Sequence, residues 1–174
     1  MKRIKDAIER KLCEKEKKWK DMEIITPEME REEIRRLITA RCMTYDTYRI
    51  IEPLLARMEK NLENVAIISS LLKDSFSPVK INAGMALLIG CQIGINIEKA
   101  MPDVVEALED KEPRVRSIAA SIIREMAIKG YKAKKWLLET LKAYAQYDPD
   151  KDVQLSCAMA LRAIELQKEG NNYG

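Results

Sequence analysis

The sequence predicts an all-α solenoid, a stack of helical pairs that forms one domain over residues 1–174. Three observations indicate this fold class. Apolar residues recur along most of the chain with the period of an α-helix. Six glycines, six prolines and one phenylalanine are fewer turn and aromatic residues than an all-β fold of this length needs. A short segment also recurs three times, which is typical of repeat architectures. About nine helices in about four pairs are expected.

Residues 1–43 are predicted to form an N-terminal helical cap or a degenerate repeat. The first helix has an apolar stripe, and its other faces are rich in lysine and glutamate. That stripe comprises Ile4, Ile8, Leu12 and Trp19. A second helix begins at Thr26, whose capping hydroxyl precedes Pro27 and Glu28.

Residues 44–168 are predicted to contain the repeats, and residues 169–174 a flexible tail. Apolar periodicity predicts seven further helical segments, at residues 46–60, 63–73, 78–93, 97–109, 113–129, 133–147 and 151–168. Gly90, Gly94 and Gly130 are interpreted as breaks between helices. Pro53 and Pro102 lie in or near helix starts, where proline is tolerated or kinks the helix.

The repeat is anchored by an aspartate at the turn inside each helical pair. The three copies begin at Asp74, Asp110 and Asp148. A valine follows five residues later in each copy, as Val79, Val115 and Val153, and the next residue is Lys80, Arg116 or Gln154. Small residues come next, at positions 83–84, 119–120 and 157–158, followed by Leu87, Ile123 and Leu161. We expect the aspartate to bond the turn's N–H groups and the small residues to let neighbouring helices approach closely.

These motifs resemble those of the HEAT-repeat family over about residues 63–165. In that family an apolar helix ends in Leu-Leu-x-Asp, and a short turn leads to Val-Arg-x-x-Ala-Ala. Residues 71–74 with 78–80, and residues 108–110 with 113–116, fit this pattern. The third copy departs from it, because Gln154 replaces the basic residue and the turn around Asp148 is longer.

The resemblance implies a right-handed solenoid whose helices at 63–73, 97–109 and 133–147 line a concave face. It also implies that the aspartates and basic residues of the motif tie adjacent repeats together and do not form an acid/base site.

Catalytic chemistry is not expected. The chain contains no histidine, which removes His-dependent triads and His-containing metal sites. It also excludes the activity of HEAT-like deoxyhypusine hydroxylases, which hold iron with His-Glu pairs. HEAT-like alkylpurine DNA glycosylases use a basic concave face with Trp and Asp, whereas this chain has only Trp19 and Trp136 and no traceable basic groove. The sequence therefore predicts no enzyme and no cofactor.

The cysteines indicate neither a metal nor a redox site, because Cys13, Cys42, Cys91 and Cys157 are widely spaced. Cys91 and Cys157 are interpreted as small buried apolar residues. A Cys13–Cys42 bridge is expected only in an intracellular hyperthermophile, a source that the high Lys, Glu and Ile content also indicates. The chain shows no signal peptide and no apolar stretch long enough for a bilayer, so a cytoplasmic protein without membrane contact is expected.

The predicted function is a protein-interaction scaffold that binds a partner protein along the concave face. Trp136 is the leading anchor, because repeat alignment places it at a solvent-facing position and exposed aromatics are frequent hot spots. The alternative for Trp136 is packing between helices. The candidate partner-binding residues of that face are Asp103, Glu106, Lys135, Trp136, Glu139 and Lys142. Their mixed charges favour a protein over a phosphate backbone.

The alternative function is association with nucleic acid through the basic first helix. The net charge of the chain is only +3. Residues 1–20, however, carry nine Lys/Arg against four Asp/Glu, a local charge of +5. The alternative interpretation of this segment is a solvent-exposed helix face in which Glu14–Lys18 and Glu16–Lys20 pair at i,i+4.

The last helix carries a second apolar stripe, formed by Leu155, Met159 and Leu166. A terminal repeat should present a polar outer face. We therefore expect these residues to contact another copy of the chain, across a twofold axis in the simplest case. The alternatives are that the tail folds back over them or that they face the penultimate helix.

Overall fold

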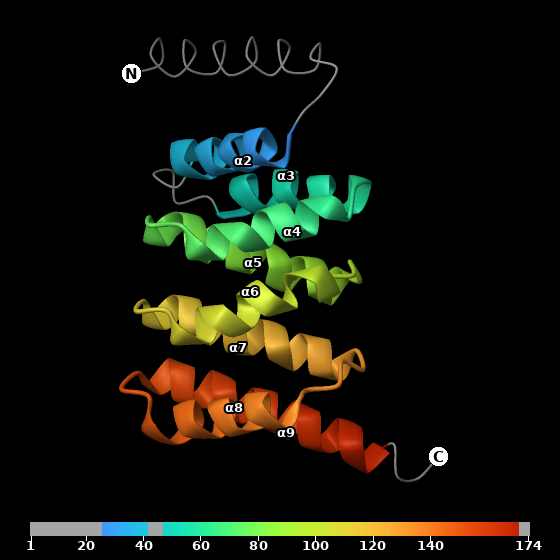
Figure 1. Cartoon of the computed structure of the whole chain (residues 1–174), viewed down its shortest axis with the longest axis vertical. Helices are drawn as coiled ribbons and strands as arrows, with labels where there is room; N and C mark the ends of the chain where they lie inside the picture. The colour runs from blue at the N-terminus through green and yellow to red at the C-terminus, as the bar shows by residue number, and fades with distance from the viewer. Residues whose placement is uncertain (1–25, 42–46, 171–174) are drawn as a thin grey trace.

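The computed structural model describes residues 26–41 and 47–170. Over these residues the chain forms eight α-helices and no strand, stacked in layers as an α-solenoid (Figure 1). The all-α solenoid prediction is therefore confirmed. Three predictions concern residues outside the described ranges: a basic first helix with Trp19, a Cys13–Cys42 bridge and the part of the tail at residues 171–174.

The helices follow the predicted segments closely. They are α2 (Pro27–Arg41), α3 (Thr47–Lys60), α4 (Glu63–Ser70), α5 (Ser77–Ile93), α6 (Met101–Glu106), α7 (Pro113–Ile128), α8 (Lys135–Tyr147) and α9 (Lys151–Gly170). The segments predicted at 63–73 and 97–109 are composite. α4 tightens into a 3-10 turn over Leu71–Lys73, and α6 lies between two such turns at Glu98–Ala100 and Ala107–Glu109.

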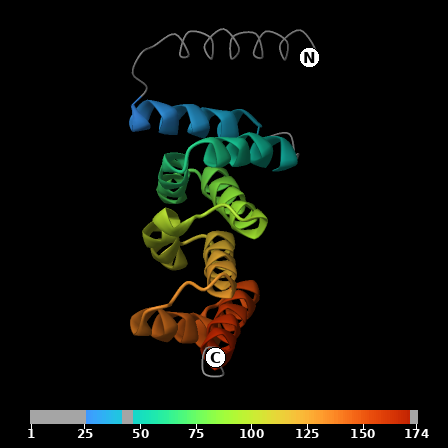
Figure 2. The same cartoon turned by 90° about the vertical axis from the view of Figure 1, so that its right-hand side faces the viewer.

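The helices sort onto two sides of the stack. α4, α6 and α8 lie on one side and α5, α7 and α9 on the other (Figure 2). The second side is the structural spine, in which α5 packs on α7 and α7 packs on α9, while α8 packs on α9. Because each motif aspartate precedes a spine helix, the aspartate turns link the two sides.

Apolar motif residues form the core. Val79, Val115 and Val153 are buried at equivalent positions of the three spine helices. Gly84 permits a close helix approach, because a Cβ atom there would lie 2.8 Å from Cγ2 of Ile118 on α7. Ala158, at the equivalent position of α9, is exposed, since no helix in the described part of the chain packs on that face.

The interpretation of Gly90 as a helix break is wrong. Gly90 lies inside α5, and a Cβ atom there would lie 2.9 Å from Cε of Met58 on α3. Its role is close packing. Gly94 and Gly130 do follow helix ends, with φ of 103° and 97°. Each is followed by the same closing bond, from Ile95 N–H to the Gly90 carbonyl and from Tyr131 N–H to the Met126 carbonyl, both 2.9 Å.

Candidate functional site

The motif aspartates each shape their own turn. One carboxylate oxygen (Oδ1) accepts a hydrogen bond from the backbone N–H two residues later. Asp74 accepts from Phe76 at 2.9 Å, Asp110 from Glu112 at 2.8 Å and Asp148 from Asp150 at 2.9 Å. This bond holds the chain in the turn that leads into each spine helix.

The same aspartates bind a cation from the preceding layer. Arg35 Nε donates to Asp74 at 2.6 Å, and Lys80 Nζ contacts both oxygens of Asp110 at 2.7 and 2.6 Å. Arg116 donates two hydrogen bonds of 2.8 Å to Asp148 in a bidentate pair. The side chains of Arg116 and Asp148 are 9% and 1% exposed. These three pairs form an ionic ladder that connects consecutive layers.

Gln154 occupies the Lys80/Arg116 position in the last copy. Its Nε2 donates to the Asp148 carbonyl at 2.6 Å, just as Arg116 Nη1 donates to the Asp110 carbonyl at 2.8 Å. The glutamine therefore keeps the bond to its own turn but supplies no charge for a further layer.

In two of the ladder pairs, electrostatics favour the ionised carboxylate. Burial alone would raise the pKa of Asp148, but hydrogen bonds from Arg116 and from the Asp150 N–H outweigh it, so this pKa lies below its ordinary value. The pKa of Asp74 is lowered in the same way, with Arg35 and the Phe76 N–H opposing the effect of burial. The ladder carboxylates are thus bound counter-ions of a structural network.

Two of the predicted partner-binding residues lie on α6 and contact α4 or the 3-10 turn that follows it. Asp103 accepts a hydrogen bond from Ser69 at 2.6 Å and pairs with Lys73 at 2.9 Å. Glu106 pairs with the same lysine at 2.8 Å. Asp103 is therefore partly buried in an inter-helix contact, contrary to its expected exposure, because α4 supplies a hydroxyl group and the 3-10 turn after it supplies an ammonium group opposite it.

The other four predicted residues lie on the exposed side of α8. Trp136 is 50% exposed, and Lys135, Glu139 and Lys142 are exposed around it. Lys135 and Glu139 form a loose i,i+4 pair at 3.9 Å. Trp136 thus occupies the solvent-facing position that repeat alignment predicts.

Tyr147 is a second surface aromatic of α8, near Trp136 in the sequence but outside the six residues predicted to bind a partner. It is 76% exposed. It follows Trp136 by eleven residues, which is about three helical turns, so both rings lie on one side of α8. That spacing in the sequence is the signal that could have identified it. Tyr144, between them, is partly buried, and burial raises the pKa of its hydroxyl.

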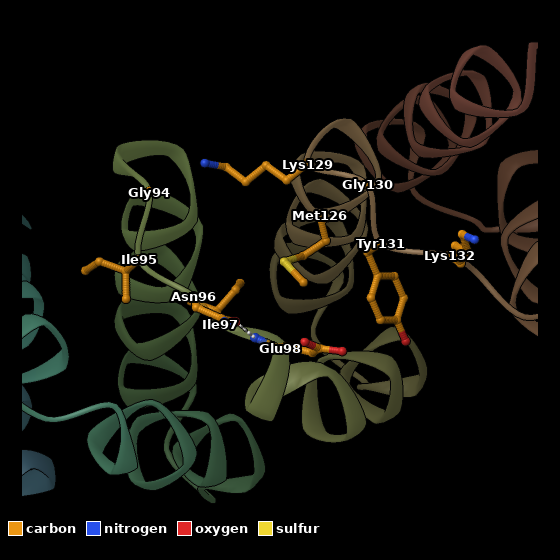
Figure 3. Close-up of a pocket in the computed structure, with 10 residues that line it drawn as sticks. All are labelled: Gly94, Ile95, Asn96, Ile97, Glu98, Met126, Lys129, Gly130, Tyr131 and Lys132. Atoms are coloured by element: carbon orange, nitrogen blue, oxygen red, sulfur yellow. Dashed lines mark hydrogen bonds between the residues drawn. The ribbon is translucent and has the colours of Figure 1, made fainter. Parts of the chain in front are cut away.

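A pocket of about 580 Å³ lies between the turn after α5 and the turn after α7 (Figure 3). Ile97 and Met126 are buried in its wall, while Lys129 and Lys132 are exposed. Glu98 is the single acidic residue of the lining. The pocket is a gap between consecutive repeats with mixed polar and apolar walls.

Metal and thiol chemistry have little support in the described residues. No group of three or more His, Cys, Asp or Glu side chains among them is placed to hold a metal ion. Cys91 and Cys157 are buried, and burial raises the pKa of Cys157 to about 11, so its thiol stays protonated at neutral pH. None of the helices in residues 26–41 and 47–170 combines the length and apolar character that a bilayer span requires.

Comparison with known proteins identifies the class of this solenoid. The family model for HEAT repeats matches residues 64–162, which is more than half of the chain. The protein therefore belongs to the HEAT-repeat family. The crystal structure of an engineered protein is similar over 75% of this chain, with 16% sequence identity and a TM-score of 0.47. This chain covers 62% of that protein. No curated protein matches the chain.

Proposed function

We propose that the protein is a non-catalytic scaffold that binds another protein along the face formed by α4, α6 and α8. HEAT repeats generally use extended surfaces of stacked helices for binding. The observation that carries this proposal is the pair of exposed aromatics on α8, Trp136 and Tyr147. Large aromatic side chains on a rigid helix are frequent anchors of protein interfaces.

The surroundings of these aromatics support a protein partner. Lys135 and Lys142 lie beside Glu139 on α8, and Glu106 adds a further exposed carboxylate on α6. A surface with both signs of charge around apolar anchors suits the polar rim and apolar centre of a protein interface. Stacked helices also hold their side chains in place before binding, which lowers the entropic cost of association.

The test is affinity capture from the native cell with the tagged full chain, compared with two variants. Trp136→Ala removes the anchor. Ile93→Ala removes an aliphatic side chain that is 58% exposed on α5, on the other side of the stack. Both variants should unfold at nearly the wild-type temperature, because each residue is a surface side chain.

We expect a discrete protein partner that survives nuclease treatment, is lost with Trp136→Ala and is retained with Ile93→Ala. Equal capture by both variants would exclude the α8 anchor.

Nucleic acid is the second candidate, favoured by the charge of residues 1–20 and by a lysine-rich connection before α8. Residues 129–134, between α7 and α8, hold three lysines and no acidic residue. Partners that disappear with nuclease, together with a steep loss of affinity as salt increases, would support this candidate over the scaffold.

A further inference from the structure

α9 lies in the last layer of the described stack (Figure 1), and several of its apolar side chains are exposed. Leu155 is 61% exposed, Met159 43% and Leu166 49%. At about 100° per residue these three positions fall on one side of the helix. Contiguous apolar surface of this kind usually marks an interface. This surface is on a different helix from the proposed partner-binding face, so its function is argued independently.

The preceding spine helices show which kind of element packs on this side of a spine helix. On α7, the equivalent side contacts α9, where Ser117 bonds Ser156 at 2.9 Å and Arg124 lies 3.9 Å from the sulfur of Met159. On α5, Gly84 leaves room for Ile118 of α7. α9 also has a small residue at the equivalent position, Ala158, and this residue is exposed. The surface is therefore a helix-docking face.

Leu166 distinguishes between two ways of covering that face. On α5 and α7, the next helical pair covers the residues equivalent to Leu155 and Ala158. A further stacked pair would cover Leu155 and Ala158 in the same way. It would leave Leu166 exposed, because Gln92 and Ile128, at the equivalent positions, are exposed within the stack. A partner that covers the whole stripe must instead run along α9 from Leu155 to Leu166.

The geometry points to a second copy of the chain, with its α9 antiparallel to the first across a twofold axis. α9 spans Lys151–Gly170, so its midpoint lies between residues 160 and 161. Leu155 and Leu166 are equally distant from that midpoint. Antiparallel pairing therefore places Leu155 of each copy opposite Leu166 of the other.

Smaller and longer side chains pair in the same register. Ala158 lies opposite Ala163 of the second copy, which lets the two helices approach closely. Met159 lies opposite Arg162, whose guanidinium can contact the thioether sulfur as Arg124 Nη1 does at 3.9 Å within one chain. The contact is isologous and closes on itself, so it produces a dimer and no filament.

The test is sedimentation of the full chain over a wide concentration range. We expect the mass to rise from one to two copies with concentration. Leu155→Glu with Leu166→Glu should hold the protein at one copy, because it places four carboxylates in the apolar contact. The matched control is Ile93→Glu with Ile128→Glu, which changes two exposed isoleucines on α5 and α7 and should dimerise like the wild type.

Circular dichroism of each variant checks that the helices are retained. A single copy at every concentration would overturn the proposal, and so would a dimer that persists in the Leu155/Leu166 variant. Assemblies that keep growing with concentration would indicate head-to-tail stacking and would also overturn it.

Orientation is tested by disulfide trapping in a Cys13→Ser, Cys42→Ser background, in which the remaining cysteines are buried. Leu155→Cys and Leu166→Cys are prepared separately and then mixed. We expect crosslinking only in the mixture, since antiparallel pairing separates the two copies of either residue by about 16 Å along the axis. Crosslinking of each variant alone would show parallel pairing and contradict the model.

Discussion

At the scale of single residues, each motif aspartate makes two kinds of contact with one carboxylate. It fixes the turn before a spine helix and binds a cation from the layer before. The motif in the sequence predicts the turn and a structural pairing of the aspartates with Lys80 and Arg116. It does not predict Arg35 as the partner of Asp74, because α2 lies outside the recognisable repeat and Arg35 occupies a different register in its helix.

The Arg116–Asp148 pair should be the most costly ladder contact to break. Asp148→Asn retains an oxygen for the Asp150 N–H but leaves the buried guanidinium without a counter-charge. We expect the free energy of unfolding, measured with urea, to fall by about 3 kcal/mol. The control is Glu32→Gln, which breaks the exposed Arg36–Glu32 pair and should cost at most about 1 kcal/mol. Similar losses of unfolding free energy in the two variants would contradict the expectation that a buried ion pair costs more to break than an exposed one.

The cost of Asp148→Asn should depend on pH. Because the pKa of Asp148 is lower in the folded chain, the unfolded chain takes up the proton first as the pH falls. The stabilisation is complete above the ordinary carboxyl pKa of about 4 and is lost as the pH falls through the folded value. The difference between wild type and variant should therefore be constant near neutrality and shrink below about pH 4. A difference that grows in acid would refute this assignment.

At the scale of helices, periodicity in the sequence predicts nearly every element to within a few residues. The reason is that apolar residues recur with the helical period along most of the chain and that several helices end at a strong signal, such as the aspartate turn or Gly94 and Gly130. Gly90 shows the limit of this reasoning. A glycine that breaks a helix and one that admits a neighbouring side chain look the same in a sequence, and only the position of Met58 distinguishes them.

Gly84 and Gly90 make a matched pair for testing close approach, because both lie inside α5. A new Cβ at Gly84 meets Cγ2 of Ile118, a branch fixed to the Ile118 Cβ. At Gly90 it meets the flexible end of Met58. We expect Gly84→Ala to lower stability by about 1–2 kcal/mol and Gly90→Ala to be nearly neutral, since alanine also gains helix propensity.

Chemical denaturation measures both glycine variants. Ile118→Leu, which removes the Cγ2 branch, should restore part of the loss in Gly84→Ala. Equal effects at the two glycines, or no rescue by Ile118→Leu, would mean that steric contact with Ile118 does not set the cost.

At the scale of the whole molecule, the sequence predicts which helices share a side but not how each side chain is used there. Trp136 is exposed at its predicted position because α8 follows the repeat register. Asp103 is at an equivalent register, yet it is tied to Ser69 of α4 and to Lys73 of the following 3-10 turn, which lie 34 and 30 residues earlier. Contacts between layers depend on the rotation of neighbouring helices, and periodicity within one helix does not contain that information.

Because the repeats stack in one dimension, breaking a contact in one layer should change stability mainly in that layer and its neighbours. Stability in a solenoid is approximately a sum over repeats and nearest-neighbour contacts, so damage at one end should not loosen the other. Asp148→Asn should speed amide hydrogen exchange in α8 and α9, while α3 and α4 keep wild-type protection. Asp74→Asn, which breaks the contact with Arg35, should do the reverse and loosen α2. Hydrogen exchange with mass spectrometry resolves these segments. Uniformly faster exchange in either variant would show that the layers unfold as one cooperative unit.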